Sequence, residues 1–135
     1  MWVSTTIICG EFLVMLLVRG IRGATTADNN TRESIVESTV EMLQKMVDIN
    51  NIPTDDIAAA IFTTTEDLNA EFPATAAREL GWEYVALLDS HEMKVPDSQS
   101  QCIRVLLLVN TTKSSADIQN VYLKGASNLR SRGIK

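Results

Sequence analysis

Residues 102–109 read Cys-Ile-Arg-Val-Leu-Leu-Leu-Val, the most strand-like stretch of this 135-residue sequence. A short apolar run that contains branched side chains predicts a buried β-strand over 103–109. Arg104 lies inside this run, and leaving a buried charge unpaired costs about 3–5 kcal/mol. Arg104 must therefore be paired, hydrogen-bonded or directed into a polar cavity. Two interpretations stand equal at this point: a structural ion pair, with Glu92 as the candidate partner, and a ligand-binding arginine.

The segments around this strand predict further strands and helices. Apolar runs predict strands at 16–23, 57–63 and 84–88. A broad apolar stripe predicts a long helix from a capping-box-like start at Asn30 and Glu33 to about residue 50. Pro73 opens a short helix that stops at Gly81, and a final helix is expected from Ser115 through Tyr122.

This order of elements predicts an α/β (α+β) fold, a mixed β-sheet with helices on one face. The other face of such a sheet needs a partner, so we expect self-association. Residues 15–130 form one domain, because no linker, internal repeat or low-complexity stretch interrupts them.

Two short segments flank this domain: an apolar N-terminal extension, residues 1–14, and a polar C-terminal tail, residues 131–135. The apolar run over 1–18 lacks the basic region and cleavage site of a signal peptide, and it is marginal in length for a membrane span. We interpret Met15 as the natural start and the residues before it as an upstream start-site artefact. A weak membrane or targeting role is the alternative.

Composition excludes several classes of function. A net charge of -5 and an aromatic content of 5% argue against a nucleic-acid surface. Cys9 and Cys102 lie too far apart in unlike contexts to suggest a disulfide framework or a metal site, so a cytoplasmic location is the default. A single histidine, His91, removes most metal sites from consideration, and the sequence has no Gly-x-Ser-x-Gly elbow that would support a Ser-His-Asp triad.

Few side chains remain that could carry chemistry. Arg22 lies between glycines at a predicted strand end, where its guanidinium could enter a cleft, although a solvent-exposed arginine at a turn is the commoner situation. Asp89 and Glu92 are close enough in sequence for acid–base work, but nothing else supports a glycosidase-type site. Tyr122 and Phe72 would by default be core residues.

Taken in order, these stretches resemble the chorismate mutases of the AroH class. The resemblance covers about residues 16–130 and rests on several motifs in register: RGIRGATT (19–26), FPATAARELGW (72–82), EM (92–93), CIRV (102–105), VYL (121–123) and LR (129–130). It implies a pericyclic Claisen rearrangement of chorismate to prephenate in aromatic amino-acid biosynthesis, with no cofactor and no metal. It also implies a homotrimer of the pseudo α/β-barrel type with active sites between subunits.

The resemblance assigns roles to individual residues. Arg104 would bind the ether oxygen and a carboxylate of chorismate, Arg22 would hold the side-chain carboxylate, and Glu92 would accept a hydrogen bond from the ring hydroxyl. Substrate-binding roles are implied for Tyr122, Phe72, Ala74, Arg78, Leu88, Asp89, Leu129 and Arg130.

Two positions depart from the family pattern. Asp89 stands where the family often has a cysteine, and Thr75 stands where it often has a lysine. Both changes make the site less positive and would weaken the binding of a dianion. Two alternative functions remain: a non-catalytic trimer that binds small carboxylates, and an imine deaminase on a similar trimeric fold.

Overall fold

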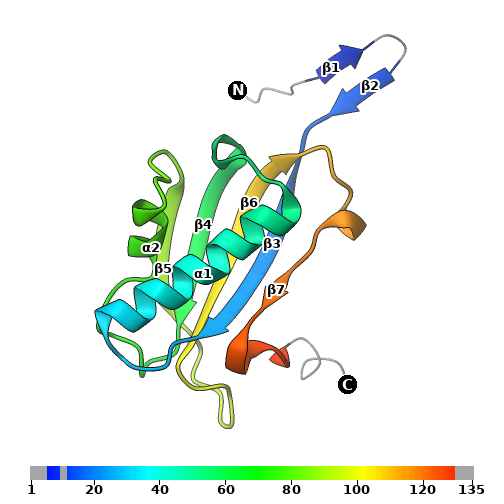
Figure 1. The fold of residues 1–135 in the computed structure, drawn as a ribbon. Helices are drawn as coiled ribbons and strands as arrows, with labels where there is room; N and C mark the ends of the chain where they lie inside the picture. The colour runs from blue at the N-terminus through cyan, green and yellow to red at the C-terminus, as the bar shows by residue number, and fades with distance from the viewer. Residues whose placement is uncertain (1–5, 10–11, 130–135) are drawn as a thin grey trace.

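A five-stranded mixed sheet forms the centre of the computed structural model, which describes residues 6–9 and 12–129 (Figure 1). In spatial order its strands are β5 (Ala86–His91), β4 (Ile57–Thr64), β6 (Cys102–Thr111), β3 (Leu17–Thr26) and β7 (Val121–Tyr122). β6 runs antiparallel to both β4 and β3, whereas β5 pairs parallel with β4 and β7 pairs parallel with β3. The predicted mixed sheet is confirmed.

The pairing of β3 with β6 fixes which residues share a face. Its register runs without interruption from Leu17 opposite Thr111 to Thr26 opposite Cys102. Within it, Arg22 lies opposite Leu106 and Ala24 lies opposite Arg104. Because side chains alternate along a strand, these four residues lie on the same face of the sheet.

The long helix α1 (Arg32–Asn50) lies across the other face of the sheet (Figure 1). Its buried apolar side chains pack on the core residues of that face: Ile35, Val36, Met42, Leu43 and Met46. The N-cap is Thr31, whose hydroxyl accepts the Ser34 N–H at 3.2 Å. The start predicted at Asn30 and Glu33 was therefore one residue early, while the end at Asn50 is confirmed.

The predicted final helix from Ser115 is wrong. The segment instead forms a 3-10 turn, η2 (Ser115–Asp117), the two-residue strand β7 and a second 3-10 turn, η3 (Lys124–Ala126). Ile118, Val121 and Tyr122 have helical spacing, but Val121 and Tyr122 pair with Gly23 and Ala24 of β3. Pairing with the exposed edge of β3 outweighs the weak local preference for a helix.

The N-terminal residues form a separate two-stranded sheet of β1 (Thr6–Cys9) and β2 (Phe12–Met15), which projects beyond the start of β3 in Figure 1. The interpretation of residues 1–14 as an extension and of 131–135 as a tail stays a prediction, and the tail lies outside the described residues. Among the helices that the structure describes, none combines the length and apolarity that crossing a membrane requires.

The short helix α2 (Ala74–Glu79) ends where the sequence predicts it. Gly81 has a φ of +82°, in the left-handed region, and the Trp82 N–H returns to the Ala77 carbonyl at 3.0 Å. This is the geometry of a glycine that ends a helix. α2 contacts α1 and the neighbouring strand β5, and β5 begins at Ala86 rather than at the predicted residue 84. The remaining 3-10 turn, η1 (Thr54–Asp56), leads into β4.

We predict that Gly81→Ala lowers the free energy of unfolding by about 1 kcal/mol, because alanine is strained at positive φ. A Cβ at Gly81 would meet nothing within 4 Å, so steric crowding adds nothing to this effect. Urea denaturation at one fixed protein concentration measures the change. Gly81→Asn is the control, since asparagine tolerates this conformation better and should lose less. Equal stability of the alanine variant and the parent would contradict the assignment.

Candidate active site

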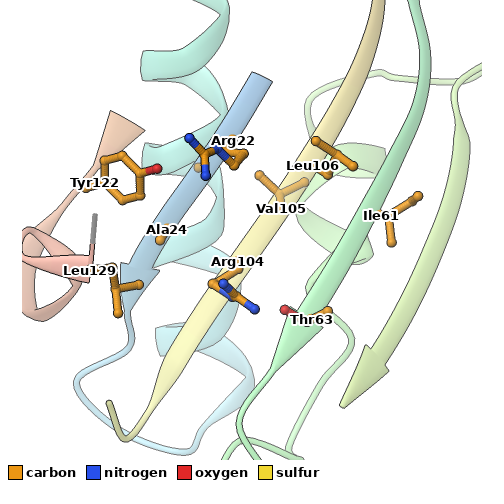
Figure 2. A pocket seen from close by; sticks show the side chains of 10 residues that line it. Arg22, Ala24, Ile61, Thr63, Arg104, Val105, Leu106, Tyr122 and Leu129 are labelled. Carbon is orange, nitrogen blue, oxygen red and sulfur yellow. The ribbon is translucent and has the colours of Figure 1, made fainter. Parts of the chain in front are cut away.

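An open cavity of about 540 Å³ lies on the sheet face opposite α1 (Figure 2). Arg22 of β3 and Arg104 of β6 both line it, together with Tyr122 of β7 and Leu129. The rest of the lining comes from Gly23, Ala24, Ile61, Thr63, Val105 and Leu106. We call this cavity the arginine pocket. No acidic residue of the described chain belongs to its lining, so the charged groups that line it are two guanidinium groups, one of which is ion-paired with Glu92 outside the lining.

Arg104 is both ion-paired and in the pocket. Its Nη2 bonds to a carboxylate oxygen of Glu92, and the Arg104 side chain remains 52% exposed. The ion pair predicted from the sequence is therefore confirmed, and it does not exclude the ligand-binding interpretation. A half-exposed guanidinium has further N–H donors for a second anion beside Glu92.

Arg22 is positioned by its own backbone. Its N–H donates to Oδ1 of Asn120 at 2.8 Å, in the segment that precedes β7. In Figure 2 the Tyr122 hydroxyl points toward the side of the pocket that carries Arg22. A guanidinium and a phenol directed into one cavity can together hold a carboxylate.

The C-terminal segment forms one wall of the pocket. Ala126 and Leu129 pack with Ala24 and Cys102 in a small apolar cluster that also includes Tyr122. Burial raises the pKa of the Cys102 thiol to about 11, so this cysteine stays protonated at neutral pH. A protonated buried thiol is a poor nucleophile, and Cys102 contributes packing to the pocket wall.

The other predicted site residues do not line the arginine pocket within one chain. Phe72 and Asp89 line a separate hollow at the end of β5, and Phe72 is 66% exposed. Ala74 is buried, and its N–H donates to Oδ1 of Asp89 at 3.1 Å. Leu88 is 60% exposed on β5, and Arg78 lines a third hollow between the end of α2 and the start of β5. Arg130 lies outside the described residues.

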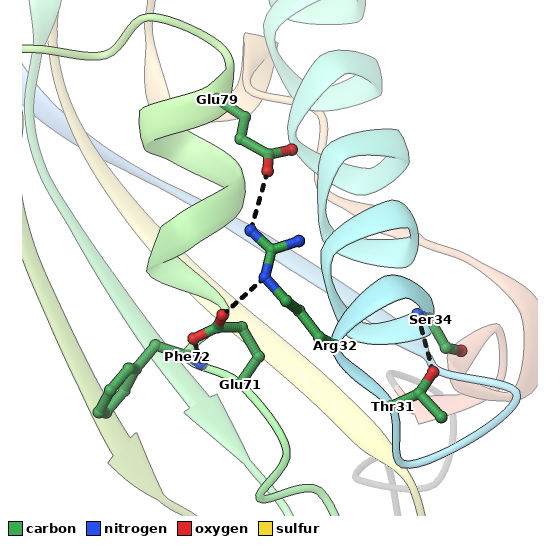
Figure 3. A network of polar contacts seen from close by, with 6 residues as sticks. All are labelled: Thr31, Arg32, Ser34, Glu71, Phe72 and Glu79. Carbon is green, nitrogen blue, oxygen red and sulfur yellow. Dashed lines mark hydrogen bonds and ion pairs between the residues drawn. The ribbon is translucent and has the colours of Figure 1, made fainter.

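Ion pairs connect the segment 71–79, which contains Phe72, to the start of α1 (Figure 3). Arg32 bonds to Glu71 at 3.1 Å and to Glu79 at 3.4 Å, so one guanidinium bridges both ends of the segment. Glu71 also accepts the Phe72 N–H at 2.8 Å. Exposed ion pairs stabilise a fold only slightly, so these contacts contribute little to the free energy of unfolding.

Sequence reasoning missed several residues of the pocket, of which Thr63 is the most informative. Thr63 lies opposite Arg104 in the pairing of β4 with β6. Its hydroxyl is buried and has no hydrogen-bond partner among the residues that the structure describes. The sequence carries no signal for this position, because which β4 residue faces Arg104 depends on the strand register.

Asp89 titrates unusually. Burial raises the pKa of its carboxyl, while the Ala74 N–H and the Arg78 charge oppose this effect in part. A carboxyl whose pKa rises on folding destabilises the folded state at pH values above that pKa. The cost disappears as the pH falls toward the ordinary value of 3.8.

We therefore predict that Asp89→Asn raises the melting temperature at pH 7, and that the gain shrinks as the pH falls toward 3.8 and is lost below it. Asparagine keeps an oxygen that can accept the Ala74 N–H. Asp89→Ala removes both the charge and the acceptor, and it should give a smaller gain or a loss. Thermal melts of the three proteins between pH 4 and 8 test this, and a gain that is constant across this range would be the contrary result.

Comparisons with known proteins agree with this geometry. Residues 18–132 match the family model for chorismate mutase type I. A chorismate mutase AroH from Thermus thermophilus is 47% identical over 115 residues, 84% of this chain and 94% of that protein. One from Bacillus subtilis is 40% identical over 116 residues, 85% of this chain and 91% of that protein.

The fold agrees as well. A solved chorismate mutase from Clostridium thermocellum superposes with a TM-score of 0.79 at 49% identity, covering 80% of this chain and 96% of that one. The fold, the family model and the relatives are consistent over nearly all of the described chain. The chain therefore belongs to the type I chorismate mutase family of isomerases.

Proposed function

We propose that the arginine pocket converts chorismate to prephenate, in the cytoplasm, as a step of aromatic amino-acid biosynthesis, with Arg104 and Arg22 as the principal catalytic residues. One observation carries this proposal: two guanidinium groups from neighbouring strands line a cavity whose described lining contains no acid. A small dicarboxylate is the class of ligand that such a cavity favours.

The chemistry explains why charge is sufficient. The rearrangement is unimolecular and needs no nucleophile and no proton transfer. As the C–O bond breaks, negative charge develops on the ether oxygen. Arg104 would stabilise this charge in the transition state more than in the ground state, and one such donor contributes about 3–4 kcal/mol.

Arg22 and Tyr122 would hold the side-chain carboxylate, which restricts the substrate to its compact reactive conformation. Glu92, which is already bonded to Arg104, would orient that guanidinium and accept a hydrogen bond from the ring hydroxyl of chorismate. Asp89 and Thr75 make the surroundings less positive than a cysteine and a lysine would. Binding would therefore depend more strongly on the two pocket arginines.

We further propose a homotrimer in which each arginine pocket is completed by a neighbouring subunit. The division of the predicted residues supports this arrangement: Arg22 and Arg104 line one cavity, whereas Phe72 and Asp89 line another. Apolar side chains on the sheet face that α1 leaves open also support it, since Leu88 is 60% exposed and Leu106 is 37% exposed. In a cyclic trimer, each interface joins two different surfaces of neighbouring subunits. The hollow lined by Phe72 and Asp89 on one subunit can therefore face the arginine pocket of the next subunit.

The first prediction concerns catalysis. Arg104→Ala should lower kcat/KM for chorismate at least about 10²–10³-fold, because a preorganised donor to the ether oxygen is lost. Arg104→Lys should recover only part of the activity, since lysine lacks the planar fork. The assay follows the ultraviolet absorbance of chorismate.

The matched control is Arg19→Ala. Arg19 lies three residues before Arg22 on the same strand, but its Nε donates to the Lys113 carbonyl at 3.0 Å, and it does not line the pocket. This variant should retain activity. If Arg104→Ala consumes chorismate at the parental rate, the proposed mechanism is wrong.

The second prediction concerns the interface. Phe72→Glu places a negative charge on an exposed position that should face the neighbour's pocket, so it should inactivate the homotrimer without unfolding the chain. Mixing equal amounts of Arg104→Ala and Phe72→Glu subunits should then restore activity. Under random assembly, about a quarter of the sites combine an intact Arg104 from one chain with an intact Phe72 from its neighbour. No recovery after verified subunit exchange would place the whole site within one chain.

A further inference from the structure

We propose that Asn50, the last residue of α1, is a positioning residue that holds Tyr122 at the arginine pocket. Asn50 is remote from that pocket and does not line it. The inference rests on the proposed function, because it assigns Asn50 a role in the binding step of the same reaction. It adds a connection between the buried helix on one sheet face and the site on the other.

Asn50 makes an unusual set of hydrogen bonds. Its side chain is 1% exposed, yet it carries a polar amide. Oδ1 accepts the Gln119 N–H at 2.9 Å, and Nδ2 donates to the Gln119 carbonyl at 2.9 Å. Nδ2 also donates to the Met46 carbonyl at 2.9 Å. The side-chain amide thus pairs with the backbone of Gln119 as one strand residue pairs with another.

This pair supplies hydrogen bonds to a segment that is otherwise held mainly by apolar packing: Val121 is buried in the core, and Ile118 and Leu123 pack against it. β7 contains only Val121 and Tyr122, and strands this short are not stable by themselves. After β7, the Leu123 N–H bonds to the Ala24 carbonyl at 2.9 Å. Before β7, the hydrogen bonds to the rest of the fold are the Asn50 pair and the bond from the Arg22 N–H to Asn120, and Ile118 packs on the core. Asn50 therefore fixes the position at which the chain enters β7.

No other common side chain of this size replaces the amide. Leucine matches its branched shape, with a larger volume, but offers neither donor nor acceptor. Aspartate keeps the acceptor for the Gln119 N–H, but it loses both donors and places a charge beside two carbonyl oxygens. Without the Asn50–Gln119 hydrogen bonds, the segment that contains β7 would separate from the edge of β3 more often, and Tyr122 would move with it.

The test is a double-mutant cycle between Asn50→Leu and Tyr122→Phe, measured with the full-length assembled enzyme. Asn50→Leu should lower kcat/KM about tenfold, mainly through KM, because a loosened Tyr122 weakens binding in ground and transition states alike. In the Tyr122→Phe background the same substitution should have almost no further effect. Hydrogen exchange at the Leu123 amide should become faster in Asn50→Leu and stay unchanged in Tyr122→Phe.

The control for general destabilisation is Ile35→Val, a buried change at the opposite end of α1. It should lower stability without changing KM or the Leu123 exchange rate. If Asn50→Leu does not fold, Asn120→Ala loosens the same segment from a half-buried position and enters the same cycle. Additive effects in the cycle, or an unchanged KM in a folded Asn50→Leu, would overturn the positioning role.

The two proposals fail in different ways. Parental enzyme that consumes no chorismate overturns the proposed function, and with it any role of Asn50 in that reaction. Active parental enzyme with Asn50→Leu indistinguishable from Ile35→Val overturns the inference alone.

Discussion

The antiparallel pairing of β3 with β6 is the constraint on which the site depends. It sets Arg22 and Arg104 on one face as diagonal neighbours, close enough for both guanidinium groups to reach one ligand. A slip of the register by one residue would send one arginine to the opposite face, under α1. The core residues prevent that slip, because Ile103, Val105 and Leu107 must all face the helix at once.

The helix contributes to the site from the far side of the sheet. At Gly23, the absence of a side chain lets α1 approach closely, since Met46 occupies the space that a Cβ would need. Gly23 also lies between Arg22 and Ala24 and pairs with Val121 of β7. The same few residues of β3 therefore hold the helix on one face, the pocket on the other and the last strand at the edge.

Much of this arrangement could be predicted from the sequence, and for physical reasons. The apolar run over 103–109 predicts a strand, and Ile103, Val105 and Leu107 are buried in it. The prediction that Arg104 is a buried charge was wrong, because its side chain is half-exposed on the open face, although the ion pair with Glu92 does form. Gly81 and Asn51 end their helices at positive φ, which the residue types favour. The resemblance to a known family supplied the roles, which neither composition nor spacing could provide.

The failures have physical reasons too. Ile118, Val121 and Tyr122 have a spacing that suits a helix, and no local signal shows that the edge of β3 and Asn50 will hold this segment extended. Thr63 was missed because its neighbourhood depends on the pairing of β4 with β6. Phe72 and Asp89 line a different cavity from the two arginines. This separation depends on tertiary structure, which the order of motifs along the sequence does not show.

The one-sided covering of the sheet has a consequence for protein engineering. The face that α1 leaves open carries both the arginines and the apolar side chains of Leu88 and Leu106. In the proposed assembly, any selection for turnover is also a selection for subunit association, and polar substitutions made to improve the solubility of a single chain would remove a wall of the site. A monomeric catalyst built on this scaffold would need a new segment of its own to replace the surface that a neighbour supplies.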